Sequence, residues 1–132
     1  MARYVDEIMN PELFFLRPQD TVGTALLGIL SLGITAAPVV DPQRRPAGVV
    51  SLRDLVSATG GNTVGERMTA PAVTVARSAE IRDAGRTLAE RDVHRLIVVD
   101  DEDRAVGVVS SLDLVRALLE LPVTHPATFP HQ

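Results

Sequence analysis

Gly48-Val49-Val50-Ser51-Leu52-Arg53-Asp54 is followed, 59 residues later, by Gly107-Val108-Val109-Ser110-Ser111-Leu112-Asp113, a second copy of the pattern Gly-Val-Val-Ser-x-x-Asp. The same offset, with no gap, relates Met9 to Met68, Arg45 to Arg104 and Val39-Val40-Asp41 to Val98-Val99-Asp100. A fixed internal period indicates repeated structural units. We therefore predict two equivalent repeats, residues 1–60 and 61–121, followed by a flexible tail, residues 122–132, that shows no periodicity.

Each repeat is predicted to follow the order β-α-β-β-α after a short leading helix. β-Branched runs bounded by turn residues predict two hairpins, over residues 38–41 with 48–50 and over 96–100 with 107–109. Apolar residues at helical spacing predict a longer helix from residue 20, ending at Gly33, and another from residue 78. Thr63 and Glu66 form a capping-box pattern at the second leading helix. Short extended pieces are expected at 13–16 and 73–75.

A repeat of this size cannot bury both faces of a small sheet alone. We therefore expect an α+β fold in which the two β-α-β-β-α repeats pack sheet against sheet about a pseudo-twofold axis. Helix faces carrying Leu26, Ile29, Leu55 and Leu114 are expected to stay exposed and to join two copies in a homodimer.

Composition excludes several chemistries. The chain has no Cys, and all 13 of its basic residues are Arg, so thiolate nucleophiles, thiolate metal ligands and Schiff-base or Walker lysines are absent. A net charge of −4 with scattered Arg argues against a nucleic-acid partner. No apolar run has the length of a membrane span, and Asp6 and Glu7 precede no signal-peptide core. The expectation is a cytoplasmic protein without a membrane partner.

The repeated Gly-Val-Val-Ser-x-x-Asp segment resembles the signature of CBS domains. The segments Ala37-Pro38-Val39-Val40-Asp41 and His94-Arg95-Leu96-Ile97-Val98-Val99-Asp100 resemble the strand that precedes this signature. The resemblance implies a stand-alone CBS pair, or Bateman module, that acts as a regulatory sensor and not as an enzyme. It further implies an adenine nucleotide (AMP, ADP or ATP) or related adenosyl ligand in clefts between the repeats, no required cofactor and a possible separate effector protein.

The same resemblance assigns roles to residues of the two copies. Asp54 and Asp113 would hold ribose hydroxyls, and Ser51 and Ser110 would bind phosphate at helix N-termini, where an anion is favoured. Basic side chains would also reach phosphate, with His94 and Arg95 serving the Asp54 cleft and Arg53 serving the Asp113 cleft. The positions that match His94 and Arg95 are the uncharged Thr35 and Ala36. Adenine would contact backbone near Ala36 or Arg95 and at 73–75, which includes Val73 and Thr74.

Structural interpretations stand beside these roles. Ser-x-x-Asp is also a helix-capping pattern, so a dimerisation or scaffold module with empty clefts is the alternative function. His94 and Arg95 could be ordinary surface residues, and the acidic run 100–103 is interpreted as a solvated hairpin turn. No metal site is expected, because His125 and His131 lack spaced partners. Helix packing and hairpin geometry account for four glycines: Gly23, Gly28, Gly48 and Gly107.

Overall fold

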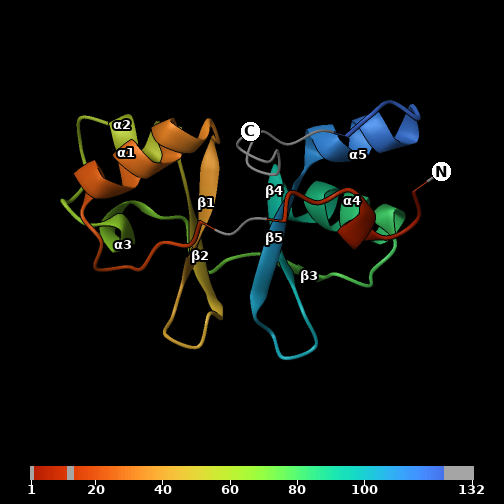
Figure 1. The fold of residues 1–132 in the computed structure, drawn as a ribbon, viewed down its shortest axis with the longest axis horizontal. Coiled ribbons are helices and arrows are strands. Elements are labelled where there is room, and N and C mark those ends of the chain that lie inside the picture. Colours follow the sequence, from red (N-terminus) through yellow and green to blue (C-terminus); the bar gives the residue numbers. More distant parts are fainter. Residues whose placement is uncertain (1, 12–13, 124–132) are drawn as a thin grey trace.

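The computed structural model describes residues 2–11 and 14–123 (Figure 1). The elements of the first repeat are η1 (Val5–Glu7), α1 (Val22–Leu32), β1 (Ala36–Val40), β2 (Pro46–Ser51) and α2 (Leu52–Val56). The elements of the second are α3 (Val64–Arg67), β3 (Thr74–Ala76), α4 (Ile81–Arg91), β4 (Arg95–Val99), β5 (Ala105–Ser110) and α5 (Ser111–Leu118). Of the predicted tail, residues 122–132, the part from residue 124 on, with His125 and His131, lies outside the described residues, as do residues 12 and 13.

Both predicted hairpins are present. β1 pairs antiparallel with β2, and β4 pairs antiparallel with β5, with the strand ends in the same register. β3 adds a parallel strand beside β4, whereas in the first repeat a single bridge between Leu16 and Val39 takes that place. The predicted extended piece at 73–75 is therefore a strand shifted by one residue, and the described part of 13–16 contributes one bridge.

Helix termini follow the sequence signals closely. α1 ends at Gly33, whose φ of 68° is left-handed, as predicted for a C-terminal glycine. α4 ends at the matching position in the same conformation, but the residue there is Asp92, with φ of 53°. At α3 the backbone N–H and the hydroxyl of Thr63 both donate to the Glu66 carboxylate, at 3.2 and 2.8 Å. These bonds confirm the capping box.

The leading segments of the two repeats are exchanged. Figure 1 shows η1, in red, beside α4 and α5, while α3, in green, lies below α1 and α2. Val5 accordingly belongs to the core of the second repeat, with Leu96 and Leu114, and Val64 belongs to the core of the first. Each repeat therefore completes its core with residues from the other, a feature that the sequence period alone did not predict.

Gly48 and Gly107 mark the points where the exchanged segments cross the hairpins. A Cβ atom on Gly48 would lie 2.7 Å from the backbone oxygen of Thr69, and one on Gly107 would lie 2.6 Å from that of Asn10. Thr69 and Val49 exchange two backbone hydrogen bonds, of 2.8 and 3.0 Å. The glycines therefore serve a close backbone approach, which corrects the interpretation that they serve hairpin geometry.

The glycines of α1 also differ from expectation. A Cβ atom on Gly28 would overlap the ring of Phe14, so this glycine does allow close packing, although the neighbour is not a helix. Nothing lies within 4 Å of the Cβ position of Gly23. The packing interpretation of Gly23 is therefore wrong, because its helix face is open.

The two hairpins meet in the centre of the molecule, with helices on the outer sides (Figure 1). Buried apolar residues from both repeats form this central layer, which consists of Val40, Ile97, Val99, Ala105 and Val108. The layer confirms the predicted sheet-against-sheet packing. Its symmetry is broken at one hydrogen bond, since the N–H of Ala105 donates to the carbonyl of Arg44 at 2.9 Å. The residue that matches Ala105 in the first repeat is Pro46, which has no N–H to donate.

The outer helix faces carry exposed apolar side chains, but these are not the ones predicted. Ile29, Leu55 and Leu114 are buried, and Leu26 packs against the core of the first repeat. The exposed apolar residues of the helices are their neighbours: Leu27, Leu30, Val56, Leu112, Val115 and Leu118. The prediction assigned the wrong face of each helix to the surface, because the rows of side chains that contain Ile29 and Leu114 are buried in the two cores. No helix in residues 2–11 and 14–123 has the length and apolar character needed to cross a membrane.

Candidate functional site

A cleft of about 250 Å³ lies where the second repeat crosses the first. One side comes from the end of β2 and the start of α2, with Val49, Ser51 and Asp54. The segment that follows α3 and crosses the first hairpin at Thr69, called the crossing segment, supplies Thr69, Pro71 and Val73. The turn before β4 and β4 itself supply the remaining lining residues: Asp92, Val93, His94, Arg95 and Ile97. The cleft therefore brings together Ser51, Asp54, Val73, His94 and Arg95, five residues that the sequence had singled out as a ligand site.

Asp54 and Ser51 cap the N-terminus of α2 in a reciprocal pair. The N–H of Asp54 donates to Ser51 Oγ at 3.1 Å, and the N–H of Ser51 donates to Asp54 Oδ2 at 2.8 Å. The capping interpretation is therefore correct, but it engages only one carboxylate oxygen. No hydrogen bond from the described residues reaches Asp54 Oδ1. Capping thus leaves this oxygen available to a donor in the cleft.

Ser110 and Asp113 repeat the same arrangement at α5, with distances of 3.2 and 2.8 Å. The surroundings differ, however. Asp54 is half-buried and lines the cleft, whereas only 5% of Asp113 is exposed. Asp113 also takes part in a further interaction. The aspartate of the second copy is therefore far less accessible than that of the first.

Backbone contacts hold His94 and Arg95 at the cleft. The carbonyl of His94 accepts a hydrogen bond of 2.9 Å from the N–H of Ser111, which ties the turn before β4 to the start of α5. Thr35 makes the matching bond with Leu52 in the first repeat, at 2.8 Å. The Arg95 side chain crosses between repeats, since its Nη2 donates to Thr35 Oγ1 at 3.2 Å. Arg95 therefore lies at the boundary of the repeats, as a cross-repeat phosphate ligand requires.

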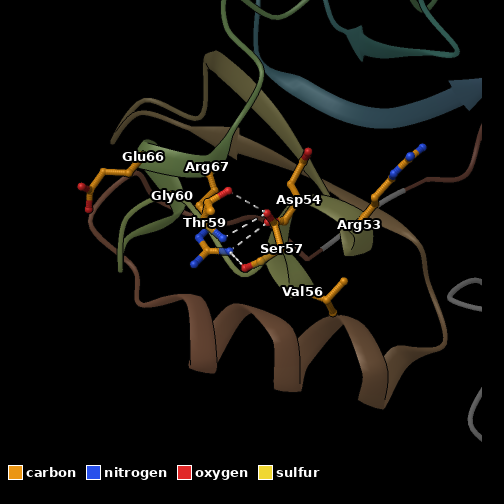
Figure 2. Close-up of a pocket in the computed structure, with 8 residues that line it drawn as sticks. All are labelled: Arg53, Asp54, Val56, Ser57, Thr59, Gly60, Glu66 and Arg67. Atoms are coloured by element: carbon orange, nitrogen blue, oxygen red, sulfur yellow. Dashed lines mark hydrogen bonds between the residues drawn. The ribbon is translucent and has the colours of Figure 1, made fainter.

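Other predicted site residues lie elsewhere. Thr74 is exposed on β3 and Ala36 is buried at the start of β1, and neither is among the described residues that line the cleft. Arg53 lines a separate pocket of about 580 Å³ together with Asp54, and in Figure 2 its side chain points away from Arg67.

Arg67 closes that second pocket and ties α3 to α2. Its guanidinium donates to the carbonyls of Ser57 and Asp54, at 2.6 and 3.2 Å (Figure 2), and to the carbonyl of Gly61 at 2.7 Å. These carbonyls lie at the C-terminal end of α2 and in the following turn, where helix carbonyls need external donors. The hydroxyl of Thr63 donates to the neighbouring Glu66 and lowers the pKa of that carboxyl. The side chains of Arg67 and Glu66 are thus engaged in hydrogen bonds with the protein itself.

Several residues of the cleft were not predicted. Thr69 and Pro71 belong to the crossing segment, whose exchange between repeats has no local sequence signal. Asp92 was overlooked as well, although its position could have been found, because it is the match of the helix-ending Gly33. In the described part of the chain, no group of three or more His, Asp or Glu side chains could hold a metal ion.

Comparison with known proteins agrees with this architecture. The model of the CBS domain matches residues 5–61 and again residues 64–120. The inosine-5'-monophosphate dehydrogenase of Methanocaldococcus jannaschii is 31% identical over 117 residues, which are 87% of this chain and 23% of that protein. The chain thus spans about a quarter of this relative.

Solved structures show the same fold. CBSX2 of Arabidopsis thaliana, in complex with AMP, is 32% identical, with a TM-score of 0.76, and the match covers 90% of this chain and 98% of the crystallised CBSX2 chain. The cytosolic domain of the Mg²⁺ channel MgtE, in complex with ATP, is 31% identical, with a TM-score of 0.77 and coverage of 89% and 49%. With two consecutive matches that span nearly its whole length, the chain belongs to the CBS domain family, as a tandem pair of CBS domains.

Proposed function

We propose that this chain is a regulatory module, not an enzyme, and that it binds an adenosyl ligand in the cleft beside Asp54. One observation carries the proposal: residues of both repeats with ribose- and phosphate-binding chemistry converge on one cleft. The complexes of CBSX2 with AMP and of the MgtE domain with ATP support the choice of ligand.

The described geometry fits each part of such a ligand. Asp54 Oδ1 would accept the vicinal ribose hydroxyls while Oδ2 keeps its capping bond. The apolar side chains of Val49, Val73 and Ile97 would flank the adenine ring. Arg95 and His94 would contact a phosphate, with the Ser51 hydroxyl as a further donor at the start of α2.

The Arg95 role has a direct test. Charge-assisted hydrogen bonds to phosphate contribute about 1.5–3 kcal/mol, so Arg95→Ala should weaken AMP binding roughly tenfold or more. Binding of adenosine, which has no phosphate, should change little. Calorimetry of both ligands on the variant measures the difference. Equal losses for adenosine and AMP would remove the phosphate role of Arg95.

Ligand binding would change how the two repeats are arranged relative to each other. The ligand would contact the start of α2 on one side and β4 with the crossing segment on the other, so binding favours one arrangement of the two repeats. We propose that this change passes to a second copy of the chain through the exposed apolar helix residues, including Leu30 and Leu118, which are 58% and 70% exposed. A separate effector protein would read the resulting dimer. Light scattering that gives a 14.2 kDa monomer at micromolar concentrations would contradict the dimer.

A scaffold without a ligand is the second candidate. It is favoured by the complete capping pairs, because Asp54 and Asp113 both have a structural role that needs no ligand. A thermal-shift panel of adenosine, AMP, ADP, ATP and GMP separates the candidates. A ligand at a hundredfold its dissociation constant should stabilise the fold by about 2.7 kcal/mol. Stabilisation by adenine compounds but not by GMP supports the sensor, and no stabilisation by any compound supports the scaffold.

A further inference from the structure

Asp92 lies in the cleft at a position where its backbone favours glycine. It ends α4 with φ of 53°, in the left-handed region, and the matching residue of the first repeat is Gly33, with φ of 68°. Asp is one of the few residues with a side chain that visits this region readily. Its carboxylate is exposed, and no hydrogen bond or ion pair with the described residues engages it.

The charges that line the cleft are unbalanced. Asp54 and Asp92 each carry one negative charge, and Arg95 is the only Arg among the described lining residues. With His94 neutral, the lining has a formal charge of −1. The Arg95 guanidinium also donates a hydrogen bond to the Thr35 hydroxyl. Arg95 can contact one phosphate group, but further phosphates have no additional Arg among these residues.

Resting on the function proposed above, we infer that Asp92 is a specificity residue that restricts the cleft to adenosyl ligands with at most one phosphate. Each added phosphate brings more negative charge toward a carboxylate that no counter-charge in the described cleft neutralises, and like charges repel over several ångströms. ADP and ATP are the ligands that Asp92 disfavours.

Calorimetry on the full chain tests this role with adenosine, AMP, ADP and ATP, in metal-free buffer of low ionic strength. The key variant is Asp92→Asn, because Asn keeps the size of the side chain and tolerates the left-handed conformation while removing the charge. Asp101→Asn removes the same charge from an exposed hairpin turn and is the matched control.

For the wild type we expect ATP to bind more weakly than AMP. Asp92→Asn should strengthen ATP binding roughly three- to tenfold and leave adenosine within about twofold, and the gain should shrink at high salt. Asp101→Asn should change neither ligand. Affinity that rises with each phosphate, or an Asp92→Asn variant that alters adenosine and ATP equally, would overturn the role of Asp92 alone. Failure of all four compounds to bind would overturn the proposed function, and this role with it.

Discussion

The two copies of the Ser-x-x-Asp segment make the same hydrogen bonds and yet have different surroundings. The bonds of the pair Ser51 and Asp54 agree with those of Ser110 and Asp113 within 0.1 Å. Asp54 lines a cleft, whereas Asp113 is almost completely buried. A helix cap is built from residues close in the chain, while a cleft is built from whatever the other repeat brings to it. Repetition of a motif therefore repeats the cap without repeating the site.

The largest effect is expected where the repeats are truly equivalent, at the two crossing glycines. Gly48→Ala and Gly107→Ala would each place a Cβ atom under 3 Å from a backbone oxygen of the crossing segment, which cannot move without breaking its own hydrogen bonds. Overpacking of this kind costs up to about 3 kcal/mol, so both variants should lose comparable stability. Urea unfolding measures the loss.

Gly23→Ala is the matched control for this pair, because nothing lies near its Cβ position in α1. A helical glycine replaced by alanine should gain about 0.5–1 kcal/mol. If only one of the two substitutions, Gly48→Ala or Gly107→Ala, lowered the stability, the close backbone approach would be important in one repeat only. The two exchanged segments would then not be equivalent.

The second prediction separates the two aspartates by ligand binding. Asp54→Ala removes the carboxylate oxygen that the cap leaves without a bond and should weaken AMP binding by about 1.5–3 kcal/mol, which is tenfold or more. Asp113→Ala should leave binding in the Asp54 cleft within about twofold. Calorimetry with AMP gives both values. Equal weakening by the two substitutions would show that the buried aspartate belongs to an equally important site.

The third prediction separates the same residues by stability. Each substitution by alanine removes the carboxylate that accepts the Ser N–H, one of the two hydrogen bonds of the capping box, and a hydrogen bond of this kind contributes about 0.5–1.5 kcal/mol. Asp113 is also buried, so its loss leaves the Ser110 N–H without an acceptor in a place that water reaches poorly. We expect Asp113→Ala to cost about 1 kcal/mol more than Asp54→Ala in urea unfolding. The reverse order would mean that the exposure of the two carboxylates does not govern their structural contribution.

Local signals in the sequence predicted most of the fold. The hairpins, the end of α1 at Gly33 and the Thr63–Glu66 capping box all depend on residues near each other in the chain, and all are present. The 59-residue offset predicted that the chain consists of two equivalent repeats. The exchange of η1 and α3 could not be predicted in this way, because a leading helix of three or four residues packs equally well, by its own pattern, on either repeat.

The candidate site was predicted in part for the same reason. Ser51 and Asp54 come from the motif itself, and the mismatch between Thr35 and His94 marked the basic side of the cleft. Thr69 and Pro71 enter only through the crossing segment. The phase error on the outer helices has a different cause. α1 is apolar on most of its circumference, so periodicity alone did not distinguish the buried Ile29 from the exposed Leu30.

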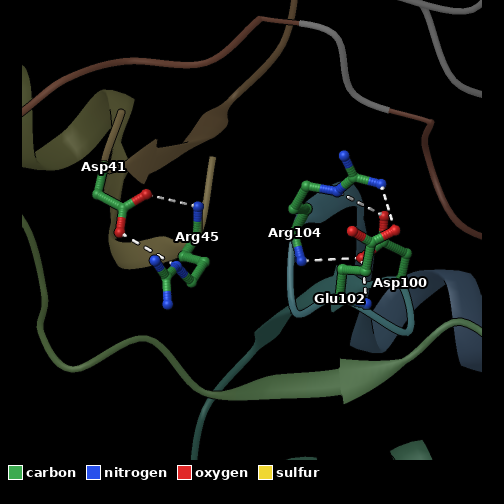
Figure 3. Close-up of polar contacts among 5 residues, drawn as sticks. All are labelled: Asp41, Arg45, Asp100, Glu102 and Arg104. Carbon is green, nitrogen blue, oxygen red and sulfur yellow. Dashed lines mark hydrogen bonds and ion pairs between the residues drawn. The ribbon is translucent and has the colours of Figure 1, made fainter. Parts of the chain in front are cut away.

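The smallest effect is expected at the hairpin turns, which are compared in Figure 3. Asp100 Oδ1 accepts backbone hydrogen bonds from Glu102 and Arg104, of 2.9 and 3.0 Å, and Arg104 Nε lies 3.1 Å from its Oδ2. Asp41 has the same backbone bonds, but Arg45 Nε is 3.6 Å away and the pair is more exposed. The hydrogen bond from the backbone N–H of Arg104 is the main cause of the lowered pKa of Asp100.

A carboxyl group with a lowered pKa in the folded state binds fewer protons there than in the unfolded chain at the same acidic pH. Its contribution to stability is therefore complete above the ordinary Asp pKa, about 4, and is lost as the pH falls through that value toward the lowered one. Asp100→Asn keeps an oxygen that can accept the backbone bonds but removes the charge, so the decrease of Tm below about pH 5 should become shallower than in the wild type. Asp41→Asn removes a carboxylate whose ion pair with Arg45 is longer and more exposed, and it is the comparison variant. Calorimetric Tm values from pH 7 to pH 2.5 measure both slopes, and a larger change for Asp41→Asn would mean that the longer ion pair, and not the shorter one, sets the acid sensitivity of the hairpins.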